Sequence, residues 1–201
     1  MNRKFHDIEQ NSEGWSNARI GKITASNFPT IMANEGKAFG EPAKKYAMRI
    51  ALEETTGVPV ETFKNAFMDR GHELEPQARS LYEDTTMNAV SNGGFMEYEK
   101  YGASSDGLIG DDEMIEIKSV IYSTHFKNIE KNYDKSYYWQ MLGNLWVYDR
   151  KVCHFVSYCP EFTGNKKLHV FPVERNKEDI KRLRIRLGEF EGLIEKYRGI
   201  L

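Results

Sequence analysis

Cysteine is scarce in this chain, because only Cys153 and Cys159 occur among its 201 residues. On one extended strand these two positions lie too far apart for a disulfide, so we expect both to be reduced thiols. The five histidines are scattered, and none is paired with another His or Cys at the spacing of a zinc site. We therefore expect oxygen ligands for any metal that the chain binds.

Long apolar runs and a large excess of one charge are also missing. No apolar run is long enough to span a bilayer, and residues 1–6 lead into no signal-peptide core, so we expect a cytoplasmic protein. The net charge of −2 excludes a uniformly basic nucleic-acid-binding protein. A local basic groove is still compatible with this charge, because a binding channel needs only local positive charge.

The apolar periodicity that is present predicts one α/β domain over residues 1–201, with a mixed central β-sheet flanked by helices. Residues 1–10 are expected to be loose, and residues 11–32 to hold a short helix and the start of a second one capped by Ser26. Pro76 falls within a predicted helix, where we expect a kink or a break. The other expected helices cover residues 42–56, 66–86, 137–148 and 177–198, and the expected strands cover residues 95–109, 114–120, 151–158 and 168–173.

A predicted β-hairpin over residues 104–118 places two carboxylates on one face. If its turn is centred on Asp111, Asp106 lies directly across from Glu116, and opposed residues of an antiparallel pair point the same way. A two-residue loop would break this register, so we expect an odd-length loop or a bulge. The isoleucines on either side of Glu116 alternate with it and are expected to face a core.

These residue types suit metal-dependent phosphodiester chemistry. Mg²⁺ prefers oxygen ligands and usually takes one or two carboxylates, which Asp106 and Glu116 can supply together with the backbone carbonyl of Ile117. Lys118 could orient a water or stabilise charge on a phosphate. The alternation of Glu116 and Lys118 is equally typical of a solvated strand face, so the spacing alone leaves both interpretations open.

Three further groups could converge on this hairpin. Glu75 lies on a predicted helix and could reach over the edge of a cleft, although a solvated helix position explains it equally well. Gln140 is a polar residue on an apolar helix, where a phosphate, a water or a neighbouring backbone group could satisfy its amide. Arg19 and Ser26 together could bind an anion, because a guanidinium and a hydroxyl suit a phosphate.

Five short motifs follow one another over residues 15–147. They are Trp15-x3-Arg19-x-Gly21-x-Ile23-Thr24-Ala25-Ser26, Gly71-x3-Glu75-x2-Ala78-Arg79, Ser104-x-Asp106-Gly107-Leu108, Glu116-Ile117-Lys118 and Tyr137-x2-Gln140. Their order and internal spacing resemble the lambda-exonuclease and YqaJ-type viral recombinase family of PD-(D/E)XK nucleases. The resemblance implies a single-domain PD-(D/E)XK core of the restriction-endonuclease-like type. Ser105 departs from it by replacing the proline of the family's name, at a position that supplies no ligand.

The resemblance also implies roles for the hairpin residues. Asp106, Glu116 and the carbonyl of Ile117 would hold the catalytic Mg²⁺, and Asp106 would touch a second ion. Two ions are thus expected, and Mn²⁺ is expected to be able to replace Mg²⁺. Lys118 would position the attacking water. Glu75 would support the metal site from its helix, as a further candidate ligand, although Pro76 directly after it could reshape that helix.

Further residues would bind the substrate. The resemblance implies that Gln140 holds water or the scissile phosphate, and that Arg19, Ser26 and Ser104 grip the 5′-phosphate of the strand being degraded. The implied activity is a Mg²⁺-dependent 5′-to-3′ exonuclease that degrades one strand of linear double-stranded DNA from 5′-phosphorylated ends. This activity would serve phage-type homologous recombination by single-strand annealing.

The implied partners are double-stranded DNA ends, a single-strand annealing protein and, in a homotrimeric ring, further copies of the chain. The protein would act in the cytoplasm of a bacterial host as a phage or prophage product. Two alternatives are a structure-selective repair endonuclease on the same core and a DNA-end-binding module that does not cleave. The anion pocket argues against the first, because an endonuclease has no terminal phosphate to grip. The clustered charges of the hairpin argue against the second.

Overall fold

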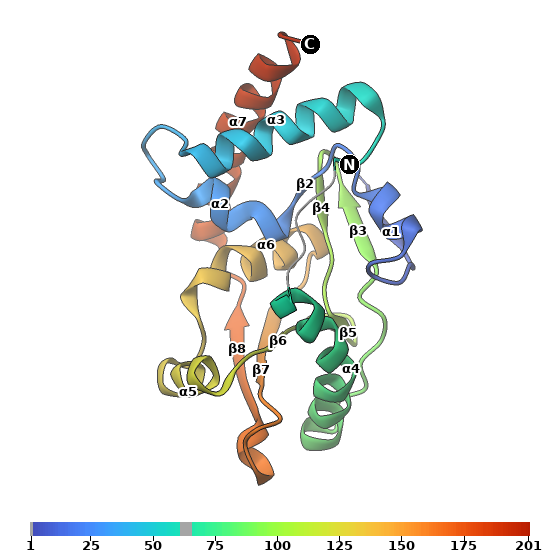
Figure 1. The fold of residues 1–201 in the computed structure, drawn as a ribbon, viewed down its shortest axis with the longest axis vertical. Coiled ribbons are helices and arrows are strands. Elements are labelled where there is room, and N and C mark those ends of the chain that lie inside the picture. The colour runs from blue at the N-terminus through green and yellow to red at the C-terminus, as the bar shows by residue number, and fades with distance from the viewer. Residues whose placement is uncertain (1, 61–65) are drawn as a thin grey trace.

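The strands form two mixed four-stranded sheets in the computed structural model, which describes residues 2–60 and 66–201 (Figure 1). One sheet has the order β1-β3-β4-β2 and the other the order β5-β6-β7-β8. The strands are β1 (Arg3–His6), β2 (Ile23–Thr24), β3 (Phe95–Tyr98), β4 (Tyr101–Ala103), β5 (Gly107–Ile109), β6 (Glu113–Ser119), β7 (Val152–Tyr158) and β8 (Leu168–Glu174). The predicted mixed α/β class is confirmed, with the strands divided between two sheets.

Helices flank both sheets. The α-helices are α1 (Glu13–Ala18), α2 (Phe28–Met32), α3 (Glu41–Thr56), α4 (Ala66–Thr86), α5 (Tyr122–Lys131), α6 (Tyr138–Tyr148) and α7 (Lys177–Arg198). The short 3₁₀ helices among the described residues are η1 (Ala25–Asn27), η2 (Lys135–Tyr137) and η3 (Gly164–Lys167). In the described residues, no helix has both the length and the apolar composition needed to cross a membrane.

The division into two sheets occurs where the chain leaves β4 and enters β5. Between these strands, Ser105 turns its backbone N–H to the Tyr148 hydroxyl at 3.3 Å and its own hydroxyl to the carbonyls of Gly107 and Ile115, both at 2.9 Å. Gly93 packs against this crossing so closely that a Cβ there would lie 1.6 Å from the Ser105 oxygen. The crossing places the residues on either side of Ser105 at the junction of the two sheets.

The N-terminal segment that we expected to be loose contains β1, so this prediction was wrong. β1 pairs antiparallel with β3 as an edge strand. Arg3 holds it in place, because its guanidinium lies 4.5 Å from the Tyr98 ring centroid and donates to the carbonyls of Val147 at 2.8 Å and Trp146 at 3.2 Å. These contacts tie β1 to the last turn of α6, where carbonyls lack the donors of a continuing helix. The strand was missed because Arg-Lys-Phe-His shows no alternation of apolar and polar residues.

Helices differ from the sequence predictions in three places. The predicted N-cap moves from Ser26 to Asn27, because residues 25–27 form η1 before α2 begins. The helix α4 is not broken at Pro76, since the burial of Ala78 and Tyr82 holds the turns that follow. The helix α5 was not predicted at all. Its buried side includes polar His125, whereas apolar residues of this helix face solvent.

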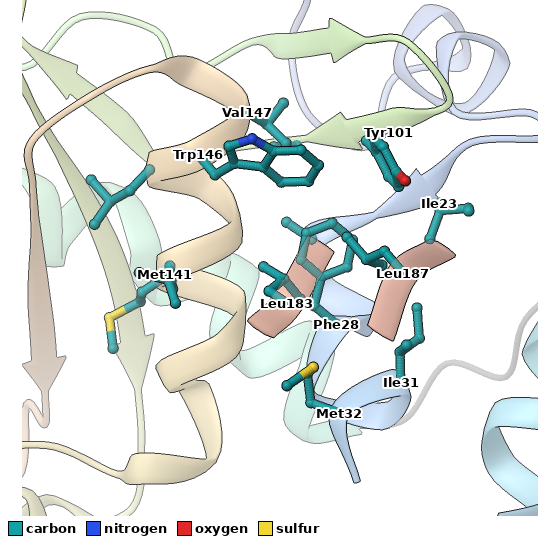
Figure 2. Close-up of a cluster of buried hydrophobic side chains, with 14 of the residues drawn as sticks. Ile23, Phe28, Ile31, Met32, Tyr101, Met141, Trp146, Val147, Leu183 and Leu187 are labelled. Carbon is teal, nitrogen blue, oxygen red and sulfur yellow. The ribbon is translucent and has the colours of Figure 1, made fainter. Parts of the chain in front are cut away.

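The larger core lies where α2, α3, α6 and α7 meet the two sheets, and Figure 2 shows part of it. Phe28 lies 6.4 Å from both Trp146 and Tyr101, measured between ring centroids, and Leu183 and Leu187 are fully buried beside them. A smaller core lies on the opposite side of β6 and includes residues of α4. The strand β6 is therefore covered on both faces, which makes a polar residue on it unusual.

Both cysteines lie in or directly after β7. They are buried free thiols, as the sequence analysis predicted. Cys153 packs in the larger core as a small apolar residue.

Candidate active site

The hairpin β5–β6 has the predicted register. Gly107 pairs with Ile115 and Leu108 with Met114, so the same register places Asp106 across from Glu116. The loop between the strands spans the three residues 110–112, which confirms the predicted odd length. Asp106 lies one residue before β5, and its Oδ2 accepts a hydrogen bond from the backbone N–H of Ile117 at 2.6 Å. This hydrogen bond holds the Asp106 carboxylate beside the backbone of β6, the strand that carries Glu116.

Glu116 is the buried carboxylate of this site, with only 1% of its surface exposed. Its Oε1 accepts hydrogen bonds from Lys118 Nζ and Gln140 Nε2, both at 2.6 Å, and its Oε2 accepts one from Asn144 Nδ2 at 3.0 Å. The structure thus brings the predicted Gln140 to Glu116. Asn144 was not predicted, although its position one helical turn after Gln140 on an otherwise apolar helix was a usable signal.

Burial and neighbouring charge shift the acidity of this cluster. Burial is the main cause that raises the pKa of Glu116 to about 7; Lys118 opposes the shift, and Asp106 and Glu75 add to it. Burial also raises the pKa of Glu75 to about 7, with the charge of Asp106 as the next cause, while Arg79 and Lys118 oppose it. The carboxylates of Glu75, Asp106 and Glu116 therefore repel one another in a partly desolvated site. This repulsion favours a bound cation.

Lys118 keeps its positive charge in this environment. Burial alone would lower the pKa of Lys118, but the charges of Glu116 and Asp106 raise it above its ordinary value. The ammonium lies 4.7 Å from the centroid of the Tyr137 ring and its side chain is 21% exposed. It can therefore present a charge to a ligand while still bonded to Glu116.

The donor set fits a small hard cation. A carboxylate has about four acceptor positions, of which hydrogen bonds occupy three on Glu116, and Asp106 Oδ1 accepts no hydrogen bond from the described residues. The N–H of Ile117 points to Asp106, and its carbonyl lies on the same side of the strand, away from β7. These two carboxylates and one carbonyl match what Mg²⁺ usually takes from a protein.

Glu75 does not extend this set to three carboxylates. In the part of the chain that the structure describes, no three His, Cys, Asp or Glu side chains come together closely enough to hold a metal. The charge of Glu75 is nevertheless one of the smaller causes that raise the pKa of Glu116. Its neighbour Arg79 donates a hydrogen bond to the carbonyl of Asp106, and this contact ties α4 to the hairpin.

A second group of predicted residues lines the same cleft. The guanidinium of Arg19 stacks over the Trp15 ring at 4.0 Å from its centroid, and the Trp15 indole N–H donates to the Ser104 hydroxyl at 2.8 Å. Ser26 is exposed, and its hydroxyl lies 3.3 Å from that of Thr24. Trp15 belongs to one of the sequence motifs but was not predicted as a site residue, and its contacts orient both Arg19 and Ser104.

One cleft of about 680 Å³ joins the two groups. Its lining includes all nine residues proposed from the sequence, which are Arg19, Ser26, Glu75, Ser104, Asp106, Glu116, Ile117, Lys118 and Gln140. They come from the C-cap of α1 and from η1, α4, the β4–β5 crossing, β6 and α6. The cleft thus combines cation-binding carboxylates, a charged lysine and an arginine with hydroxyl groups, which is a set suited to a phosphodiester and a nearby phosphate.

Comparisons with known proteins agree with this chemistry. The family model described as YqaJ-like viral recombinase domain matches residues 14–153. The structure is similar to that of the alkaline exonuclease LHK-Exo from Laribacter hongkongensis, with a TM-score of 0.79, 31% sequence identity, and coverage of 92% of this chain and 95% of that one. The same relative in complex with dAMP gives a TM-score of 0.80 and 32% identity over the same shares of the two chains.

A more distant structure shares the fold. A phage-related exonuclease from Haemophilus somnus 129PT has a TM-score of 0.73 at 17% identity, with coverage of 87% of this chain and 94% of that one. A search of curated protein sequences found no match.

Proposed function

Because this chain belongs to the family of YqaJ-like viral recombinase domains and is a phage-type exonuclease, we propose that it degrades one strand of linear double-stranded DNA in the 5′-to-3′ direction. The proposed substrate is a 5′-phosphorylated end, and the proposed cofactor is Mg²⁺. The observation that carries this proposal is the single cleft that joins the carboxylate cluster to the pocket of Arg19, Ser26 and Ser104.

The carboxylate cluster is proposed to be the cleavage centre. Asp106, Glu116 and the carbonyl of Ile117 would hold Mg²⁺, with a second ion at Asp106 and with Mn²⁺ as a substitute. A divalent ion in such a site acts as a Lewis acid that activates water and neutralises charge on the phosphate. Glu75 would contribute by adding negative charge beside the ion.

Lys118 and Gln140 are proposed to act on the water and the scissile phosphate. Both donate to the same Glu116 oxygen, so their free N–H groups are held together at one edge of the carboxylate. A Lys ammonium has three donors and a Gln amide has two, which leaves each group able to bond a ligand as well. Lys118 would orient the attacking water and stabilise developing negative charge, and Gln140 would hold the water or the phosphate.

The Arg19 pocket is proposed to set the direction of degradation. A terminal phosphate gripped there would leave the next phosphodiester at the cleavage centre, so only a strand that begins with a 5′-phosphate would be correctly placed. The relative LHK-Exo was solved with dAMP, a 5′-mononucleotide, and this supports binding of a phosphate monoester in the present chain. Guanidinium groups are well suited to such a ligand.

Arg19→Ala tests the pocket. We expect it to slow digestion of 5′-phosphorylated duplexes about tenfold or more, because a charge-assisted hydrogen bond is lost, and to affect 5′-hydroxyl duplexes much less. The measurement is the initial rate on the two duplexes. Arg184→Ala is the control, since Arg184 is exposed on α7 away from the cleft lining. An equal loss on both ends would refute the assignment of Arg19.

The family also suggests partners. We propose that the protein acts in the cytoplasm of a bacterial host, as a phage or prophage product, in recombination by single-strand annealing. A single-strand annealing protein and a homotrimeric ring around DNA belong to this proposal, and both rest on the resemblance alone.

A further inference from the structure

A second hollow adjoins the cleft at Arg19. It has a volume of about 480 Å³ and shares Asn11, Trp15, Arg19 and His72 with the lining of the cleft. The rest of its wall comes mainly from α1, the region of β2, and α3, and it includes Arg49 of α3. Two guanidinium groups therefore line the same hollow, although they lie thirty residues apart in the sequence.

Arg49 forms an ion pair with Glu53 but donates no hydrogen bond to any residue that the structure describes. Its Nε is buried and unpartnered, and its guanidinium lies 4.7 Å from the Tyr46 ring centroid. Glu53 Oε1 lies 3.7 Å from that Nε, but the Glu53 oxygens already accept the backbone N–H groups of Gly21 at 3.1 Å and Val60 at 3.3 Å. A buried donor without an acceptor is costly, so an acceptor from a ligand would be stabilising.

Arg19 is similarly available. It stacks on Trp15, and its guanidinium donates no hydrogen bond to any described residue. Burial lowers the pKa of Arg19 to about 10, and the charge of Arg49 is one of the smaller causes. The other basic residue in the wall, Lys22, is not available, because its ammonium donates to Glu97 and to the carbonyl of Glu99.

We infer that Arg19 and Arg49 form a binding site for a phosphate monoester. The wall holds two carboxylates, Glu53 and Asp69, beside the two guanidinium groups, and each guanidinium fork can bond a phosphate bidentately. A monoester carries about −1.5 to −2 near pH 7, whereas an internal phosphodiester carries a single negative charge. The inference rests on the proposed function, which supplies two sources of this group: the 5′ end of the DNA strand and the 5′-mononucleotide that cleavage releases.

The first experiment measures the affinity of the protein for DNA ends with and without a 5′-phosphate. Fluorescence anisotropy with a chelator present, to prevent cleavage, gives the affinity of a duplex with 5′-phosphate and of the same duplex with 5′-hydroxyl. If the DNA end is the source, Arg49→Ala lowers the ratio of the two affinities about tenfold. Arg49→Lys, which retains the charge but not the fork, lowers it less. Arg184→Ala is the control, because this exposed arginine also lies over an aromatic ring, 6.0 Å from the Trp146 centroid.

The second experiment measures the free nucleotide. Inhibition of digestion of a 5′-hydroxyl duplex by dAMP is compared with inhibition by deoxyadenosine, which lacks the phosphate. If the released mononucleotide is the source, Arg49→Ala weakens inhibition by dAMP about tenfold and leaves the ratio of DNA affinities unchanged. If Arg49→Ala changes neither quantity while its melting temperature matches that of the wild type, the site does not exist as inferred. If Arg49→Ala does not fold, the same two quantities measured for Arg49→Lys decide whether the site exists.

These outcomes separate the inference from the proposed function. A wild-type protein that digests 5′-phosphorylated and 5′-hydroxyl ends equally would contradict the proposed function itself. A wild-type preference for the 5′-phosphate that Arg19→Ala removes and Arg49→Ala retains, with unchanged inhibition by dAMP, would contradict only the role of Arg49.

Discussion

At the scale of single residues, the site is organised around one buried carboxylate. Glu116 is held by Lys118, Gln140 and Asn144 on a strand that is packed on both faces. Three donors offset part of the cost of burying its charge, and they also fix its orientation. The Glu116 carboxylate and its three donors therefore fix one another's positions.

Lys118→Ala should abolish cleavage with little effect on DNA binding. The loss in rate should be about 10²-fold or more, because the ammonium is proposed to act on the reacting groups. The measurements are single-turnover cleavage and affinity for a duplex in chelator. Lys151→Ala is the control, since Lys151 is an exposed lysine that pairs with Asp112 at the turn of the same hairpin. Weaker binding with unchanged single-turnover cleavage at saturation would show that Lys118 contributes to DNA affinity and not to the chemical step.

Glu116 should make the stability of the metal-free protein depend on pH. Its pKa is raised to about 7, so the folded protein retains a proton that the unfolded chain has lost above the ordinary value near 4.5. The stability from this group is present below that ordinary value and is lost as the pH rises through 7. The charges of Lys118, Asp106 and Glu75 act on the pKa of Glu116, and burial also raises the pKa of Glu75 to about 7.

Melting temperatures measured in chelator from pH 5 to 8 test this prediction. The wild type should lose a few degrees more than Glu116→Gln over this range, since ~1 kcal/mol corresponds to roughly 2–4 °C in a chain of this size. Added Mg²⁺ should raise the melting temperature of the wild type most above pH 7, where the carboxylates are ionised. Parallel curves for the two proteins would show that Glu116 is not the titrating group.

At the scale of secondary-structure elements, α6 carries the donors to the carboxylate and packs closely on α2. Gly143 lies between Gln140 and Asn144 in the sequence, and a Cβ there would lie 2.3 Å from Phe28 Cδ2. The positions of the Gln140 and Asn144 amides therefore depend on how closely α6 packs against Phe28 of α2.

Gly143→Ala should lower both stability and activity. Overpacking of this kind costs about 1–3 kcal/mol, and the shift of α6 that relieves it would move Gln140 and Asn144 away from Glu116. Gly192→Ala in α7 is the matched control, because nothing lies within 4 Å of its added Cβ. That variant should gain about 0.5–1 kcal/mol from helix propensity and retain full activity. Thermal unfolding and cleavage rate are the measurements, and unchanged activity in a destabilised Gly143→Ala would uncouple the helix from catalysis.

Local patterns predicted the elements whose signals are contained in a few residues. The register of β5–β6 followed from the centre of its turn, and α7 followed from its apolar stripe, so both were predicted correctly. The strand β1 and the helix α5 were missed, because their pairing and burial are decided by distant partners. His125 illustrates this, since its ring is satisfied by Ser157 and by the carbonyl of Lys166, far away in the sequence.

At the scale of the whole molecule, the cleft lies at the junction of the two sheets and collects residues from positions 10 to 140. Family motifs indicated which residues matter, and the structure adds the contacts that no motif contains. Arg49 is the clearest example, because α3 carries no quoted motif and only the fold places Arg49 in a hollow with Arg19. Reading the sequence alone could not bring these two residues together.

The proposed homotrimeric ring is a further property of the whole molecule. Sedimentation equilibrium of the purified protein should give three times the chain mass of 23.3 kDa. Because rings of identical subunits close through one repeated interface, intermediate masses should not accumulate as concentration rises. A constant mass of one chain would exclude the ring and leave the cleavage proposal untouched.

The proposed activity requires one cleft both to bind the 5′-phosphate and to cleave the strand that carries it. The most direct test is a Mg²⁺-dependent digestion time course on one duplex, labelled at the end of either strand and supplied with 5′-phosphate, with 5′-hydroxyl or as a closed circle. We predict rapid loss of the 5′-phosphorylated linear strand from its 5′ end, slow loss of the 5′-hydroxyl form and intact circles. Nicked circles, or digestion that begins at 3′ ends, would contradict the proposed activity.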